Sequence, residues 1–160
     1  MTKGNPADIS RPMKHQLAQI NVARCKAPLD SPVMRDFVDL LDAVNALADA
    51  TPGFIWRLKT DEGDATGVKA FEDPLIIVNM SVWGGIEALR DYVYKNSHGY
   101  AFRKRKEWFE EMTTPRLALW WIPVGHIPTV EEGKQRLEAL EREGPTPIAF
   151  TFKDAFEAPQ

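Results

Sequence analysis

The sequence predicts an α+β fold: a ferredoxin-like antiparallel sheet with helices on one face. Strand-like and helix-like segments follow one another in the order β-α-β-β-α-β, with an α-β pair after them. The chain has 160 residues, the size of one domain. We expect this domain to cover residues 15–153, between a loose N-terminal arm (1–14) and a short C-terminal tail (154–160).

The first half of the chain predicts a strand, a helix and a second strand. Residues 16–23 alternate between two faces and predict the first strand. Asp30-Ser31-Pro32 has the capping residues of a helix start, and an apolar stripe runs from Val33 to Ala48. Thr51-Pro52-Gly53 ends that helix, and residues 54–58 are rich in aromatic and branched side chains, as strands are. Residues 60–73 predict a loop.

The third strand is expected at residues 75–83, where both alternating faces are largely apolar. A strand of this kind is buried on both sides. Helices cover one face of the predicted sheet, so something else must cover the other. A second copy of the same sheet is the simplest cover, and the pattern therefore predicts a two-fold dimer.

The second half predicts three further helices and two strands. Helices are expected from Ile86, with an interruption at Asn96–Gly99, and then over a segment that carries Phe102, Trp108, Phe109 and Met112. Residues 117–122 predict the fourth strand. Thr129 and Glu132 fit a capping box before a third helical stretch that ends at Gly144-Pro145, and residues 148–152 alternate as a last strand.

Composition argues against several classes of protein. The formal net charge is -3 and the isoelectric point is about 5.6, whereas a nucleic-acid binder normally has a basic surplus. The basic run at 103–106 is flanked by glutamates and is interpreted as a solvated helix face. The single cysteine, Cys25, cannot form an internal disulfide. No apolar stretch approaches the length of a membrane span, and we expect a cytoplasmic protein that does not bind membranes.

A group of polar residues shares one face of the predicted sheet. Asn79, Ser81 and Trp83 alternate onto one side of the third strand, and Gln19 and Asn21 do the same on the first. Polar side chains in apolar strands are costly to bury unless they are hydrogen-bonded. They form either a satisfied internal network or the lining of a ligand cavity between sheet and helices, and the residues alone favour neither.

His98 is the candidate for proton transfer. It lies at the break between two helical segments, where a histidine can titrate near neutral pH. Tyr94, Arg103 and Trp108 lie nearby in the sequence and support this interpretation. The alternative is a capping or surface histidine. Three scattered histidines without close carboxylates predict no metal site.

Several strings of residues resemble a known family. They include LAQIN (17–21), PGFIWRL (52–58), VNMSVW (78–83), EALRDYVYKNSH (87–98) and LWWIPVGHIPT (119–129). These strings resemble the family called domain of unknown function 3291, over roughly residues 15–153. The family is grouped with the antibiotic biosynthesis monooxygenases among the dimeric α+β barrels.

The resemblance implies a homodimer of ferredoxin-like subunits but no agreed reaction. Its wider superfamily includes cofactor-independent oxygenases, haem-degrading enzymes, isomerases, decarboxylases and dehydratases, with pockets between sheet and helices. That position corresponds here to the face of Asn79, Ser81 and Trp83, with His98 and the helix of Trp108 as a lid. The haem-degrading relatives have their ligand histidine near the position that Arg103 occupies here, which argues against haem ligation by analogy.

These observations lead to one functional hypothesis and its alternatives. We expect an enzyme, without metal or nucleotide, that oxygenates a small hydrophobic or aromatic metabolite or isomerises or cyclises it by proton transfer. His98 would move a proton, and Arg57 and Asn79 would hold an oxyanion or carboxylate. The residues expected to bind the substrate are Gln19, Asn21, Ser81, Trp83, Tyr94, Arg103, Trp108 and Trp121. The alternatives are a non-catalytic carrier or sensor of a small molecule and a haem-binding protein.

Overall fold

A computed structural model describes residues 14–59, 69–97 and 100–160 of the chain. Most of the expected arm, residues 1–13, lies outside the described part, as do His98 and much of the expected loop at 60–73. The strands are β1 (His15–Cys25), β2 (Phe54–Arg57), β3 (Ile76–Trp83), β4 (Phe109–Glu110) and β5 (Leu117–Pro123). The helices are α1 (Arg35–Ala50), α2 (Ile86–Ser97), α3 (Tyr100–Trp108) and α4 (Val130–Glu143).

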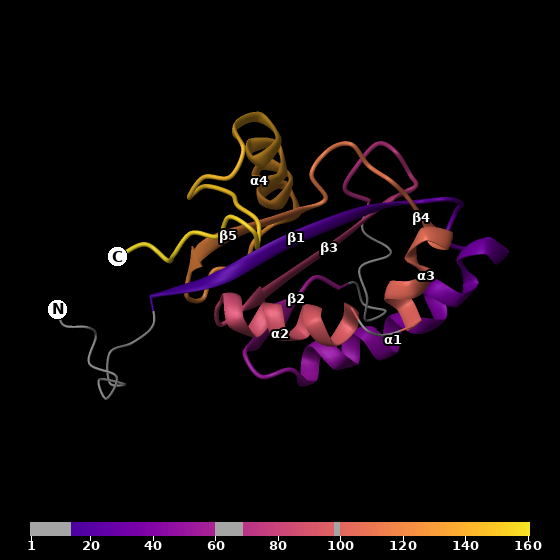
Figure 1. The fold of residues 1–160 in the computed structure, drawn as a ribbon, viewed down its shortest axis with the longest axis horizontal. Helices are drawn as coiled ribbons and strands as arrows, with labels where there is room; N and C mark the ends of the chain where they lie inside the picture. The colour runs from indigo at the N-terminus through magenta and orange to yellow at the C-terminus, as the bar shows by residue number, and fades with distance from the viewer. Residues whose placement is uncertain (1–13, 60–68, 98–99) are drawn as a thin grey trace.

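The strands form one antiparallel sheet in which β1 is central. The order is β2-β3-β1, and both β4 and β5 pair with the remaining edge of β1. This order and the helices that cover one face (Figure 1) confirm the predicted α+β, ferredoxin-like class. The longer strands β1, β3 and β5 each bury apolar residues on both faces of the sheet, because successive side chains of a strand point to opposite faces.

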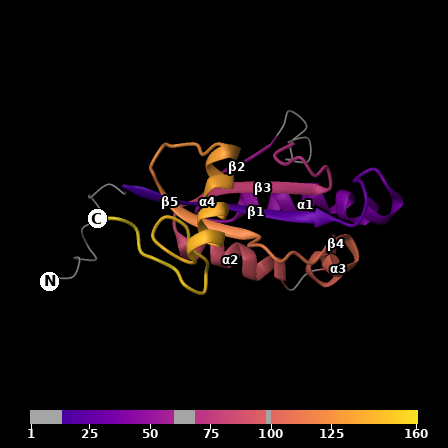
Figure 2. The ribbon, with the colours of Figure 1, turned by 90° about the horizontal axis from the view of Figure 1, so that it is seen from above.

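Helices α1, α2 and α3 lie on one face, and α4 lies on the other (Figure 1). Seen from above, α4 crosses β5 and β1 (Figure 2). Beneath it, alternate residues of the strands form a core with the apolar face of α4, including Ile20, Met80, Trp120, Leu137 and Leu140. The face that suggested a second subunit is therefore covered in part by the chain itself, because α4 folds back over it. The two-fold dimer remains a prediction.

The face beneath α1, α2 and α3 has two apolar clusters. The first, here the Trp83 cluster, contains Leu17, Trp83, Leu89, Leu119 and Phe150 among its buried members. The second, the Trp108 cluster, contains Cys25, Met34 and Trp108. Along β1 these clusters lie at opposite ends, around Leu17 and around Cys25, so the positions between them are Gln19 and Asn21.

Two expected elements differ in the structure. The helix expected to include Phe109 and Met112 ends at Trp108, because Phe109 and Glu110 pair with Cys25 and Arg24 at the end of β1. The strand expected at 148–152 is reduced to one antiparallel bridge between Phe150 and Leu119. Thr146 and Ala149 pair with each other in a tight turn, which leaves little extended chain for a ladder.

The start of α4 follows the prediction in part. Thr129 caps the helix, and its hydroxyl accepts a hydrogen bond from the backbone amide of Glu132 at 3.0 Å. The Glu132 carboxylate does not complete a capping box. It accepts instead from Trp120 Nε1 at 2.9 Å and lies 2.7 Å from His126 Nε2. The side chain thus ties the helix to β5.

Gly133 allows α4 to approach the sheet closely. A Cβ at this position would lie 2.7 Å from Ile20 Cδ1 and 3.3 Å from Met80 Sδ. We predict that Gly133→Val destabilises the protein by about 1–3 kcal/mol, because added methyl groups overpack a filled core. Urea denaturation measures the loss. Gln135→Val, at an exposed position of the same helix, is the matched control. Equal stability of the two variants would contradict the close approach of α4.

Candidate functional site

Four polar side chains meet on β1 and β3 between the Trp83 and Trp108 clusters. The register places Gln19 opposite Ser81 and Asn21 opposite Asn79. Because directly paired residues of antiparallel strands lie on the same face, all four lie on the side of α1, α2 and α3. We call Gln19, Asn21, Asn79 and Ser81 the polar cluster.

The polar cluster is a connected hydrogen-bond network. Gln19 Nε2 donates to Asn79 Oδ1 at 2.9 Å and to Ser81 Oγ at 2.8 Å. Asn21 Nδ2 donates to Gln19 Oε1 at 2.9 Å and to Asn79 Oδ1 at 3.2 Å. Trp83 Nε1 donates to Ser81 Oγ at 2.8 Å and joins the network to the neighbouring apolar cluster. Among the described residues, no buried side-chain nitrogen or oxygen lacks a hydrogen-bond partner.

Burial falls along this network from the core to solvent. Gln19 is 3% exposed and Ser81 is 6% exposed, whereas Asn79 is half-buried and Asn21 is exposed. The network therefore begins at a fully buried tryptophan and ends at a solvent-facing amide. A polar strip of this kind between two apolar clusters can orient a ligand that is otherwise apolar.

Aromatic rings form the wall on the Trp83 side. Trp83 is fully buried, stacks on Tyr92 with ring centroids 5.1 Å apart, and meets the edge of Phe54 at 5.4 Å. The Tyr92 hydroxyl, on α2, donates to the backbone oxygen of Val44 on α1 at 3.4 Å. Burial raises the pKa of this phenol, and a hydrogen bond with Asn96 opposes the rise. Tyr92 is a site-wall residue that the sequence did not single out, although it lies three positions after Leu89 on the same helical stripe.

Arg57 continues the polar strip onto β2. It pairs directly with Ser81, so it shares the face of the polar cluster. Its Nε donates to Asp49 Oδ1 at 2.8 Å, and its side chain is 13% exposed. This hydrogen bond holds the pKa of the Asp49 carboxyl below its usual range, against a smaller opposing effect of burial. The guanidinium is thus fixed in place by a carboxylate at the end of α1.

The remaining candidates that the structure describes lie on α2, α3 and β5. Trp108 is 2% exposed and packs against Phe37, with ring centroids 5.6 Å apart. Trp121 pairs with Leu17 on the Trp83 side, and its Nε1 donates to the backbone oxygen of Phe156 at 2.8 Å. Tyr94 is 67% exposed, and Arg103 is also exposed. His98, the expected acid or base, lies outside the described residues, between α2 and α3.

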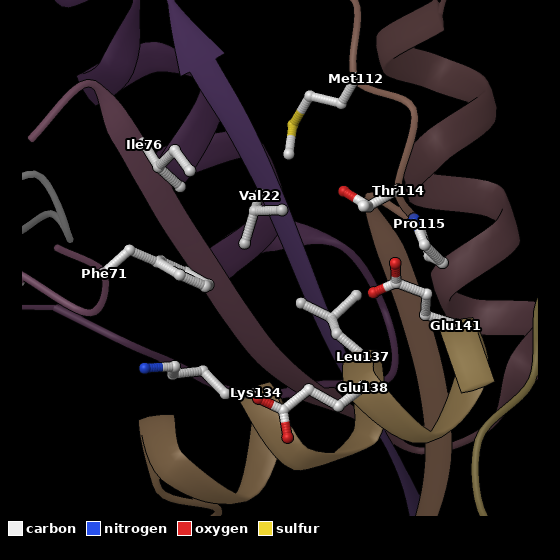
Figure 3. A pocket seen from close by; sticks show the side chains of 10 residues that line it. All are labelled: Val22, Phe71, Ile76, Met112, Thr114, Pro115, Lys134, Leu137, Glu138 and Glu141. Carbon is white, nitrogen blue, oxygen red and sulfur yellow. The ribbon is translucent and has the colours of Figure 1, made fainter. Parts of the chain in front are cut away.

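A hollow of about 240 Å³ lies on the opposite face, between the sheet and α4 (Figure 3). Its floor is apolar, and its rim carries Thr114 and three charged residues of α4. The lining residues are Val22, Phe71, Ile76, Met112, Thr114, Pro115, Lys134, Leu137, Glu138 and Glu141. No residue of the polar cluster lines it.

The sequence did not predict this hollow. One signal in the sequence was available: four of the hollow's lining residues recur at three- and four-residue spacing and therefore share one face of α4. They are Lys134, Leu137, Glu138 and Glu141. Lys134 is held in place: its Nζ donates to the backbone oxygen of Ala70 at 2.8 Å and lies 4.8 Å from the centroid of the Phe71 ring. A second hollow, of about 220 Å³, lies beside Phe109, Met112 and Arg116.

Neither a metal site nor a reactive thiol is found in the described part of the chain. No group of three or more His, Cys, Asp or Glu side chains there is placed to hold a metal ion. Cys25 is buried beside Met34 and Trp108, and burial raises the pKa of its thiol. A thiol with a raised pKa is a poor nucleophile near neutral pH.

The family model for the domain of unknown function DUF3291 matches residues 16–160. The chain belongs to the DUF3291 family. No functionally curated protein matches the sequence. Within the described residues, no helix is both long enough and apolar enough to cross a membrane.

Two solved structures are weakly similar to this DUF3291 chain. A protein of unknown function from Nitrosomonas europaea, NE2512, is 10% identical, with a TM-score of 0.45 over 72% of this chain and 94% of its own. A variant of SnoaB, a cofactor-independent oxygenase from Streptomyces nogalater, is 11% identical, with a TM-score of 0.43 over 70% of this chain and 95% of its own. Similarity at this level transfers no function to the DUF3291 chain.

The polar cluster should contribute to stability through its buried end. We predict that Ser81→Ala lowers the free energy of unfolding by about 1–3 kcal/mol, because it leaves Trp83 Nε1 and Gln19 Nε2 facing a buried position without an acceptor. Asn21→Ala, at the exposed end, should change it by less than about 0.5 kcal/mol, because water can replace the lost amide as the donor to Gln19 Oε1. Urea denaturation at neutral pH compares the two. A cost for Ser81→Ala no greater than that for Asn21→Ala would contradict the network.

The ion pair between Asp49 and Arg57 should give stability that depends on pH. The folded pKa of Asp49 lies below its unfolded value of about 3.8, so its contribution is present above that pH and is lost as the pH falls through the folded pKa. We predict that Asp49→Asn costs up to about 1 kcal/mol at pH 7, since the carboxylate is half exposed, and progressively less as the pH falls below about 3.8.

Urea denaturation at pH 7 and in acid measures this difference. Asp39→Asn, at an exposed position of α1, is the control and should show no pH-dependent loss. An unchanged cost of Asp49→Asn in acid would show that the stability comes from packing rather than from the charge.

Proposed function

We propose that this DUF3291 chain is an enzyme that acts, without a cofactor, on a small and mostly hydrophobic, aromatic metabolite. The substrate would lie on the face of the sheet beneath α1, α2 and α3. The observation that supports the proposal best is the polar cluster, which runs from buried Gln19 and Ser81 to exposed Asn21 between two aromatic clusters. Ligand sites in proteins commonly combine apolar walls with a few positioned polar groups.

Each group has a proposed role. Trp83 and Trp121 on one side, and Trp108 on the other, would bound the aromatic body of the substrate. Asn79 and Arg57 would hold an oxyanion or carboxylate, and the ion pair with Asp49 supports this role because it orients the guanidinium before the substrate arrives. His98, at the junction of α2 and α3, would accept and return a proton.

Two types of reaction fit these groups. One is isomerisation or cyclisation, in which His98 removes a proton from carbon and returns it elsewhere. The other is oxygenation of an acidic aromatic ring, with dioxygen as co-substrate and His98 as the base that forms the electron-rich anion. Consumption of dioxygen during turnover distinguishes them.

Non-catalytic binding is the second candidate function. It is favoured by one observation: the inner atoms of the polar cluster and the Arg57 guanidinium are already bonded within the protein, as expected of a structural network. A carrier or sensor would retain the metabolite unchanged. Haem remains a third candidate, and a Soret band after titration with haem would support it.

The test of the proposal begins with the ligand. Native mass spectrometry of the full chain purified under mild conditions should detect a bound small aromatic molecule, which then serves as the substrate candidate. We predict that His98→Ala lowers kcat for it by at least about 100-fold with little change in KM, as expected for loss of a general acid–base group. His126→Ala is the control, because His126 contacts Glu132 beside α4 and should leave the activity intact. Unchanged turnover by His98→Ala would show that His98 has no catalytic role.

A further inference from the structure

At the solvent end of the polar cluster, one hydrogen-bond donor and one acceptor form no bond within the cluster. Both hydrogens of the Gln19 amide and both hydrogens of the Asn21 amide are used inside the cluster, and Asn79 Oδ1 accepts two of these bonds. Among the described residues, these bonds leave two atoms over: Asn79 Nδ2, which donates, and Asn21 Oδ1, which accepts. They belong to residues that face each other across β1 and β3.

The cluster has a second orientation with the same geometry. Rotating a carboxamide by 180° exchanges its nitrogen and oxygen and keeps the heavy-atom distances. If all three amides turn, Asn79 Nδ2 donates to Gln19 Oε1 and Asn21 Oδ1, and Gln19 Nε2 donates to Asn21 Oδ1. Every contact is kept, with the donor and the acceptor exchanged.

Ser81 makes this second orientation favourable. The indole nitrogen of Trp83 can only donate, so Ser81 Oγ must accept from it in either orientation. In the first orientation Ser81 Oγ also accepts from Gln19, and its own hydrogen is left over in a residue that is 6% exposed. In the second orientation that hydrogen is donated to Gln19 Oε1. The second orientation therefore satisfies the Ser81 hydroxyl hydrogen that the first leaves over, and both orientations leave one donor and one acceptor at the solvent end.

We infer that the solvent end of the polar cluster binds a carboxamide or lactam edge of an aromatic ligand. This inference rests on the site of the proposed function and names the chemistry of its substrate. In either orientation the Asn21–Asn79 pair presents one donor beside one acceptor, and a lactam presents an acceptor beside a donor. A carboxylate offers acceptors only: it could accept from Asn79 and Arg57, but it cannot donate to the acceptor of the Asn21–Asn79 pair. The aromatic clusters on both sides of the polar cluster suit the flat body of such a ligand.

The experiment compares two probes on the full chain by isothermal titration calorimetry. One probe is 2-quinolone, which has both the N–H and the C=O, and the other is N-methyl-2-quinolone, which lacks the donor. We expect the wild-type chain to bind 2-quinolone roughly tenfold more tightly, the value of one or two lost hydrogen bonds. Asn79→Asp should weaken the binding of both probes, because two carboxylate oxygens at this position make the edge acceptor-only and repel the carbonyl oxygen that both probes carry.

Controls separate this site from the hollow beneath α4. Glu138→Gln, at the rim of that hollow, should leave both affinities unchanged. Thermal unfolding should show that Asn79→Asp is folded, and Asn79→Gln, which keeps the amide, should lose less affinity for both probes. The inference is overturned if wild type binds both probes equally or neither, or if Glu138→Gln but not Asn79→Asp weakens binding. The effect of His98→Ala on turnover judges the proposed function separately.

Discussion

The antiparallel pairing of β1 with β3 fixes the position of every other part of this structure. Eight consecutive residue pairs join the two strands, from Leu17 with Trp83 to Arg24 with Ile76. The alternation along these pairs sends one set of side chains beneath α4 and the other beneath α1, α2 and α3. A shift of one residue would exchange the two sets. The apolar residues on both sides make such a shift costly, and the polar cluster is held at one place because this register is held.

Most strands and helices could be predicted from the sequence because alternation, helical spacing and caps involve residues that are close in the chain. The alternation of 16–23 and the cap at Thr129 depend on neighbours in the chain, and the structure shows both. The predictions of a helix through Phe109 and of a strand at 148–152 were wrong for a different reason. The secondary structure of these residues depends on partners that are distant in the chain, Cys25 and Leu119. Helical spacing also cannot tell which face of a sheet a helix covers, so the position of α4 was missed.

For the candidate site, the sequence predicted which residues share a face of the sheet but not which hydrogen bonds they form. Parity along the strands placed Gln19, Asn21, Asn79 and Ser81 on one side, and the structure brings them together. The hydrogen-bond partners within the polar cluster depend on the register between β1 and β3, and that register could not be predicted from the sequence. The partner of Arg57, Asp49, lies eight positions earlier on another element and was likewise not predicted. Membership of the DUF3291 family adds no reaction, so the chemistry must come from these side chains.

We propose that a metabolite binds the sheet at the polar cluster, beneath α1, α2 and α3. Side-chain amide resonances of Gln19, Asn21 and Asn79 in ¹⁵N–¹H spectra test it most directly, recorded with and without the molecule that co-purifies with the chain. These three resonances should shift together on binding, since the amides form one network. Shifts confined to residues that line the hollow beneath α4, such as Thr114 and Leu137, would contradict it and would move the binding site to the opposite face of the sheet.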